Sequence, residues 1–98
     1  MIVCTAKNFI EEGREEEFKE LARELINNSQ QEEGCIEYQL YRAQDKNSVF
    51  CFIEKWRTRA DLEAHFKTEH FKRIVPQLEE LKAKEDEVTI YQEAVLSE

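Results

Sequence analysis

Residues 35–57, CIEYQLYRAQDKNSVFCFIEKWR, predict two β-strands joined by a short polar loop. The segments 35–42 and 48–57 are rich in β-branched and aromatic residues, and the loop over 43–47 is of hairpin length. Side chains alternate between the two faces of a strand. One face of the second strand carries Phe50, Phe52, Glu54 and Trp56, and the other carries Val49, Cys51 and Ile53. Both faces of this hairpin are therefore largely apolar.

The rest of the chain alternates between strand and helix patterns, read from the spacing of its apolar residues. The expected elements are strands at 2–9, 35–42, 48–57 and 87–95, and helices at 14–31, 61–66 and 69–83. Pro76 should kink the last helix because it removes a backbone donor. The order β-α-β-β-α-β predicts an α+β, ferredoxin-like split βαβ fold, with helices on one face of a four-stranded antiparallel sheet. Residues 1–98 are expected to form a single domain.

The second face of the predicted sheet needs a cover. An antiparallel sheet with one face in water should alternate hydrophobic and polar residues, and the 48–57 strand does not. Helices cover one face, and a second copy of the chain is the simplest cover for the other. We therefore expect a homodimer through the sheet face, as in a dimeric α/β barrel, with a small apolar pocket beside the sheet.

The composition excludes several classes of partner. The 98 residues include 22 acidic and 14 basic side chains, giving a formal net charge of −8. This charge opposes binding to nucleic acid or to an anionic membrane. No apolar run is long enough to span a bilayer and the N-terminus does not resemble a signal peptide, so a cytoplasmic location is expected. Cys4, Cys35 and Cys51 are expected to be buried free thiols.

The two histidines of the chain lie in HFKTEH, residues 65–70. On one continuous helix, His65 and His70 would diverge by about 140°. Thr68 is a candidate N-cap that would end one helix and start the next, so that both side chains could share a target. A metal ion there would have to recruit carboxylates from distant parts of the chain, and no metal ligands are expected.

Two roles for these histidines remain open. One is packing, with the imidazoles satisfied by backbone carbonyls or by Glu63 and Glu69. The other is acid–base chemistry, because an imidazole with a pKa near 6.5 suits a general base for a phenol or hydroquinone. The neighbouring aromatic residues could likewise be ordinary core, or could sandwich a flat ring.

Four short motifs resemble a known family: GCIEY at 34–38, FIEKW at 52–56, LEAHF at 62–66 and EHF at 69–71. They look like the antibiotic biosynthesis monooxygenase (ABM) domain, and most closely its small bacterial quinol-monooxygenase-like branch. The resemblance extends from Ile2 to about Val95. It implies a ferredoxin-like protomer that dimerises through its sheets, in agreement with the two apolar strand faces.

The resemblance also implies an activity, the oxidation of a small quinol or phenol by O₂ without flavin, haem or metal. A base removes a hydroxyl proton, the resulting anion passes an electron to O₂, and the radical pair recombines. The catalytic candidates carried over are His65, His70 and Glu54. The substrate-binding candidates are Trp56, Phe52, Phe66, Phe71 and Asn8. Tyr38 and Tyr41 should project to opposite faces of the sheet, so at most one of them lines a given pocket.

Other activities of similar proteins would require different residues. Haem-degrading relatives need an iron-ligating histidine where this chain has Val75, which counts against haem degradation. One alternative is a dimeric module that binds a small molecule without turnover. Another is an isomerase acting on a phosphorylated signalling molecule, which would need a cation near the pocket. Its candidate cations are Lys7, Arg42, Arg57 and Arg59.

Overall fold

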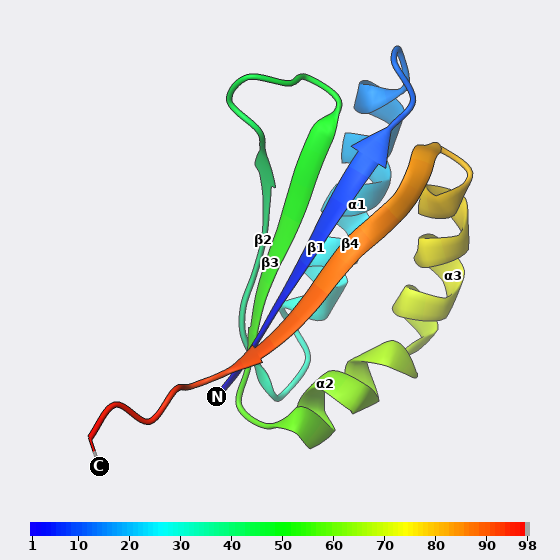
Figure 1. The fold of residues 1–98 in the computed structure, drawn as a ribbon. Helices are drawn as coiled ribbons and strands as arrows, with labels where there is room; N and C mark the ends of the chain where they lie inside the picture. The colour runs from blue at the N-terminus through cyan, green and yellow to red at the C-terminus, as the bar shows by residue number, and fades with distance from the viewer. Residues whose placement is uncertain (98) are drawn as a thin grey trace.

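The computed structural model describes residues 1–97 and contains seven elements (Figure 1). In chain order they are β1 (Ile2–Ile10), α1 (Glu15–Ser29), β2 (Cys35–Arg42), β3 (Val49–Trp56), α2 (Arg59–Phe66), α3 (Glu69–Glu79) and β4 (Lys82–Gln92). The strands form one antiparallel sheet in the order β2-β3-β1-β4. This arrangement confirms the predicted α+β ferredoxin-like fold, with the second helical segment divided into α2 and α3.

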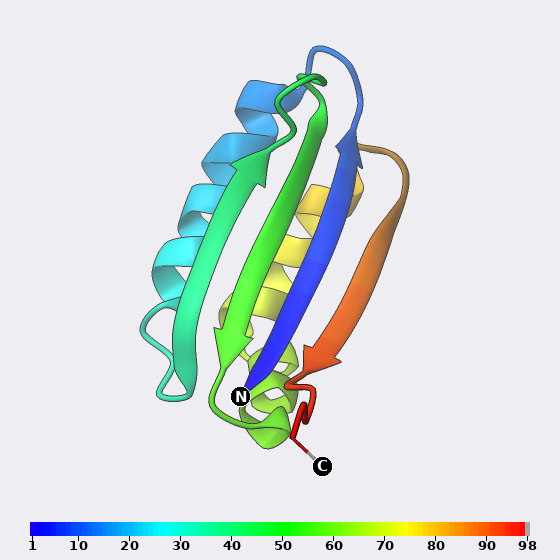
Figure 2. The same cartoon turned by 60° about the vertical axis from the view of Figure 1, so that its left-hand side comes forward.

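The three helices lie on one face of the sheet, and the other face is open (Figure 2). Burial in β3 alternates residue by residue: the face with Phe50 and Trp56 is buried against the helices, and the opposite face is half-buried. The hydrophobic core lies between sheet and helices. Its largest helix-borne members are Phe18 and Leu25 of α1, Leu62 of α2, and Ile74 and Leu78 of α3. No helix among residues 1–97 is long and apolar enough to cross a membrane.

Thr68 separates α2 from α3, as predicted. Its Oγ1 accepts a hydrogen bond from the backbone N–H of Phe71 at 3.3 Å and donates one to the carbonyl of His65 at 2.8 Å. The first bond caps α3, and the second satisfies a carbonyl at the end of α2. The chain changes direction at this point (Figure 1), so His65 and His70 project from two different helices.

The last helix and strand differ from the prediction. The helix expected over 69–83 ends at Glu79, and the strand expected over 87–95 runs from Lys82 to Gln92. Leu81 extends the apolar spacing of α3 and is buried, which explains the longer helix prediction. The backbone turns there instead, and Lys82 pairs with Ile10 of β1. Pairing with the available edge of β1 overrides the local pattern in this charged segment.

Candidate functional site

A cavity of about 120 Å³ lies between the sheet and the helices. We call it the sheet–helix cavity. Most of its lining is apolar, with contributions from β1, β2, β3, β4, α1 and α3 and from the end of α2. Its lining includes five residues predicted for the site, Asn8, Phe52, Glu54, Phe66 and Phe71. Among the lining residues that were not predicted for the site are Val75, Leu78, Lys82 and Asp86. The cavity is therefore apolar with a few polar groups, as small-molecule sites commonly are.

Glu54 is the buried carboxylate of the cavity. It lies in β3, with its side chain on the helix-covered face. The indole Nε1 of Trp56 donates a hydrogen bond to Glu54 Oε1 at 3.0 Å. Burial raises the pKa of Glu54 to about 7, and the hydrogen bond from Trp56 opposes the shift. A carboxylate that is half ionised near neutral pH suits a general base.

Trp56 supports the cavity without lining it. Its side chain is fully buried, and its indole ring packs against the imidazole of His65 with ring centroids 4.7 Å apart. Its N–H orients the carboxylate of Glu54. The structure therefore gives Trp56 a different position from the substrate-contacting one suggested by the sequence.

The polar groups of the cavity lie at its two ends. In the sheet register, Cys4 of β1 is opposite Glu54 of β3, and Ala6 is opposite Phe52. Asn8 is four residues from Cys4, roughly 13 Å along the strand. The sheet wall of the cavity thus runs from Glu54, past the apolar Ala6 and Phe52, to Asn8.

Asn8 is buried and is available to a ligand. Its amide nitrogen donates to the carbonyl of Ala6 at 2.9 Å, which uses one of its two N–H groups. At the helix side, the rings of Phe66 and Phe71 pack against each other with centroids 5.3 Å apart. A flat apolar molecule in the cavity would contact these rings and Phe52.

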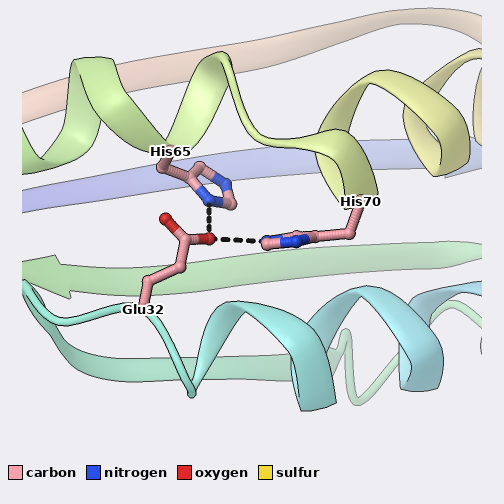
Figure 3. Close-up of side chains that lie close together, drawn as sticks. All are labelled: Glu32, His65 and His70. Atoms are coloured by element: carbon pink, nitrogen blue, oxygen red, sulfur yellow. Dashed lines mark hydrogen bonds and ion pairs between the residues drawn. The ribbon is translucent and has the colours of Figure 1, made fainter.

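His65 and His70 share one partner, Glu32, in the loop between α1 and β2 (Figure 3). The Nδ1 atom of His65 and the Nε2 atom of His70 both lie 2.7 Å from Oε2 of Glu32. The two carboxylates that the sequence analysis named as partners point elsewhere, since Glu63 pairs with Arg59 and Glu69 with Arg73. That expectation was wrong because both glutamates lie on outward faces of their helices. We call the three residues the Glu32–His65–His70 cluster.

The cluster lies behind the cavity wall. Neither histidine lines the sheet–helix cavity. His65 is fully buried, and its Nε2 lies 3.5 Å from the hydroxyl of Tyr38, which does line the cavity and is opposite Glu54 across the β2–β3 pair. Burial lowers the pKa of His65, while the hydrogen bond with Glu32 opposes that shift. The donor set of the cluster, two imidazoles and a carboxylate, is one that zinc-class metal ions bind.

The cations considered for a phosphorylated ligand lie elsewhere. None of Lys7, Arg42, Arg57 and Arg59 is among the residues that line the sheet–helix cavity. Lys82 does line it, and its ammonium contacts Glu79 at 2.8 Å and Asp86 at 2.7 Å. With Glu54 and Asp86 in the wall, the cavity offers little to a phosphate.

Comparisons with known proteins agree with the fold and the motifs. The model of the antibiotic biosynthesis monooxygenase (ABM) family matches residues 1–77. A Bacillus subtilis protein named "Putative monooxygenase YcnE" is 33% identical over 81 residues, which cover 83% of this chain and 85% of that protein. A Synechocystis protein named as uncharacterised, sll1783, is 37% identical over 90 residues, or 92% of this chain. The match spans 61% of the length of that relative.

The structural comparison gives the same result. A crystal structure described as an antibiotic biosynthesis monooxygenase matches with a TM-score of 0.92 at 33% identity, covering 97% of this chain and 100% of that one. The family resemblance drawn from the four motifs is confirmed by the family model, by the relatives and by the shared fold. The chain belongs to the antibiotic biosynthesis monooxygenase family.

Proposed function

We propose that this protein is a cofactor-independent monooxygenase that oxidises a small quinol or phenol with O₂, and that Glu54 is its general base. The observation that carries the proposal is the placement of Glu54 in an apolar cavity with its pKa raised to about 7. Family membership supplies the reaction class. The buried carboxylate and the aromatic lining supply the site.

The proposed reaction begins with transfer of a hydroxyl proton from the bound quinol to Glu54. The quinolate passes one electron to O₂, the resulting radical pair forms a carbon–oxygen bond at the ring, and the peroxide takes the proton back from Glu54. The ring hydroperoxide then loses water, so that one oxygen atom stays on carbon as a carbonyl and the other leaves in water. A quinol and O₂ thereby give a hydroxyquinone and water. General base catalysis of the first step is worth about 10²–10⁴-fold.

Each predicted residue has a place in this mechanism. Phe52, Phe66 and Phe71 hold the ring and exclude water. Asn8 hydrogen-bonds the oxygen at the end of the substrate remote from Glu54. Trp56 orients the base. In this proposal His65 and His70 do not touch the substrate. His65 supports the cavity wall by packing against Phe66 and Phe71.

The size of the cavity favours compact substrates. At about 120 Å³, it resembles the engineered apolar cavity of about 150 Å³ that binds benzene. A single-ring quinol is close to this size, and a larger fused system would have to project from the cavity. Benzoquinols are therefore expected to bind within the cavity more completely than fused polycyclic phenols.

We also propose that the chain forms a homodimer through the open face of its sheet. That face carries the half-buried side chains of Val49, Cys51 and Ile53. Tyr41 and Tyr91, which pair with Cys51 and Val3 on the same face, are each 51% exposed. A second copy stacked on this surface would remove these apolar groups from water.

Oxygen uptake with benzoquinols and naphthoquinols, corrected for spontaneous oxidation, tests the enzymatic proposal. The wild type should show saturable uptake that Glu54→Gln reduces by about 10²–10⁴-fold, while substrate binding is retained. Glu63→Gln, on the outer face of α2, is the matched control and should behave as the wild type. Equal uptake by wild type and Glu54→Gln would rule out Glu54 as the base. Saturable binding with no uptake above the blank would favour a binding module.

A further inference from the structure

The Glu32–His65–His70 cluster gathers three metal-ligating side chains from three separate parts of the chain (Figure 3). Glu32 comes from the loop before β2, His65 from α2, and His70 from the first turn of α3. Their ligand atoms all lie within 4.8 Å of one another. We propose that these three residues bind a divalent metal ion of the zinc class, one ion per chain.

The donor set fits such an ion chemically. Zinc binds imidazole nitrogen and carboxylate oxygen at about 2.0–2.2 Å, usually with tetrahedral geometry. Two donors on one tetrahedral zinc are therefore roughly 3.3 Å apart. Glu32 Oε2 lies 2.7 Å from each histidine nitrogen and the three ligand atoms lie within 4.8 Å of one another, so an ion is admitted by a withdrawal of the carboxylate and a small adjustment of the two imidazoles. Glu32 lies in a loop, where its side chain can make this small movement.

The residues around the cluster provide a hydrogen-bond partner for a metal-bound histidine and a route by which an ion can enter. When Nδ1 of His65 binds the ion, its Nε2–H faces the hydroxyl of Tyr38, 3.5 Å away. Histidine ligands commonly donate their second N–H to such a partner, which fixes the ring. The side chains of His70 and Glu32 are 14% and 13% exposed. An ion can therefore enter from that side and keep a water molecule as its fourth ligand.

The position of the cluster gives the ion a structural role. None of its three residues lines the sheet–helix cavity. The ring of His65 does contact Phe66 and Phe71, with centroids 5.9 and 5.1 Å apart, and both phenylalanines line that cavity. The ion would clamp the loop before β2 to α2 and α3 and so hold one wall of the cavity. The ion takes no part in the proposed oxidation of the quinol.

Two measurements on the chelator-treated protein test the proposal. Titration calorimetry with Zn²⁺ measures binding, and thermal unfolding with and without Zn²⁺ measures Tm. The expected result is saturable binding of one Zn²⁺ per chain and a rise in Tm. His70→Ala and Glu32→Gln should weaken binding by more than the roughly 10–100-fold that loss of an outer-sphere partner costs. Both substitutions affect partly exposed side chains, and far-ultraviolet circular dichroism checks that each variant is folded.

The matched control is Glu33→Gln, which alters the neighbouring loop residue. The side chain of Glu33 is 92% exposed and pairs with Arg57. This variant should bind Zn²⁺ as the wild type does. Co²⁺ as a probe should give the visible absorption of a nitrogen- and oxygen-ligated ion, without a thiolate charge-transfer band.

Three outcomes would overturn the assignment. The first is the absence of saturable Zn²⁺ binding. The second is equal binding by wild type, His70→Ala and Glu32→Gln, which would place the ion on other carboxylates of this acidic chain. The third is a thiolate band with Co²⁺, which would place the ion on one of the free cysteines.

Discussion

Trp56 donates its indole N–H to the carboxylate of Glu54, two residues earlier on the same face of β3, at 3.0 Å. Glu54 lines the sheet–helix cavity and Trp56 does not. The tryptophan thus acts on the cavity through the orientation and ionisation of its neighbour. Two predictions depend on this pair.

The first prediction concerns stability and pH. The pKa of Glu54 rises from 4.5 to about 7 on folding, so the folded protein holds the proton more tightly than the unfolded chain does. The free energy of unfolding should therefore fall as pH rises through the window from 4.5 to about 7. The loss attributable to Glu54 is on the order of 3 kcal/mol.

Urea denaturation of wild type and Glu54→Gln at a series of pH values measures this effect. The glutamine keeps an acceptor for Trp56 but does not titrate, so the difference between the two proteins should change across the window. A difference that is constant from pH 4.5 to 8 would contradict the raised pKa.

The second prediction concerns Trp56→Phe. The hydrogen bond from Trp56 favours the ionised form of Glu54, so its removal should raise the pKa of Glu54 further. A hydrogen bond to a charged group is worth about 1.5–3 kcal/mol, which corresponds to an upward shift of about one to two pH units. The inflection in the pH profile of oxygen uptake should move by that amount. An unchanged inflection in a folded variant would show that the indole does not tune the base.

The third prediction concerns the boundary between α2 and α3. Thr68→Ala removes the hydroxyl that caps α3 and binds the carbonyl of His65, and it should destabilise the protein by about 0.5–2 kcal/mol. Thr68→Ser keeps the hydroxyl and is the control. Chemical denaturation measures both variants. Equal loss of stability in Thr68→Ser would assign the effect to the methyl group instead of the cap.

The fourth prediction concerns the open face of the sheet. Ile53 lies at the middle of β3 on that face, opposite Thr5 and Gln39. Ile53→Lys places a charge where the proposed dimer buries apolar surface, and should convert a dimer to a monomer in sedimentation experiments. Lys72→Glu, on the exposed side of α3, alters charge away from the sheet and should leave the assembly unchanged. A wild-type chain that sediments as a monomer would contradict the proposed dimer.

Local sequence patterns were sufficient to predict most of the fold. The period of two in β3 divided its side chains between two faces, and the capping chemistry of Thr68 located the break between two helices. Both signals depend on neighbours within a few residues, so they can be predicted from the sequence. The start of β4 could not be predicted in this way, because Leu81 continues a helical spacing. Lys82 finds its strand partner in β1, more than seventy residues earlier in the chain.

The candidate site likewise divides into features that local sequence patterns predict and features that only the tertiary structure decides. Phe52 and Glu54 could be assigned to one face of a strand, and both line the cavity. Burial depth could not be inferred from the alternation, and Trp56, on that same face, is covered by His65. Glu32 carries no local signal, since it lies 33 residues from His65 and meets it only when the loop before β2 folds against α2. Periodicity determines which way a side chain points, whereas packing of distant segments decides what it touches.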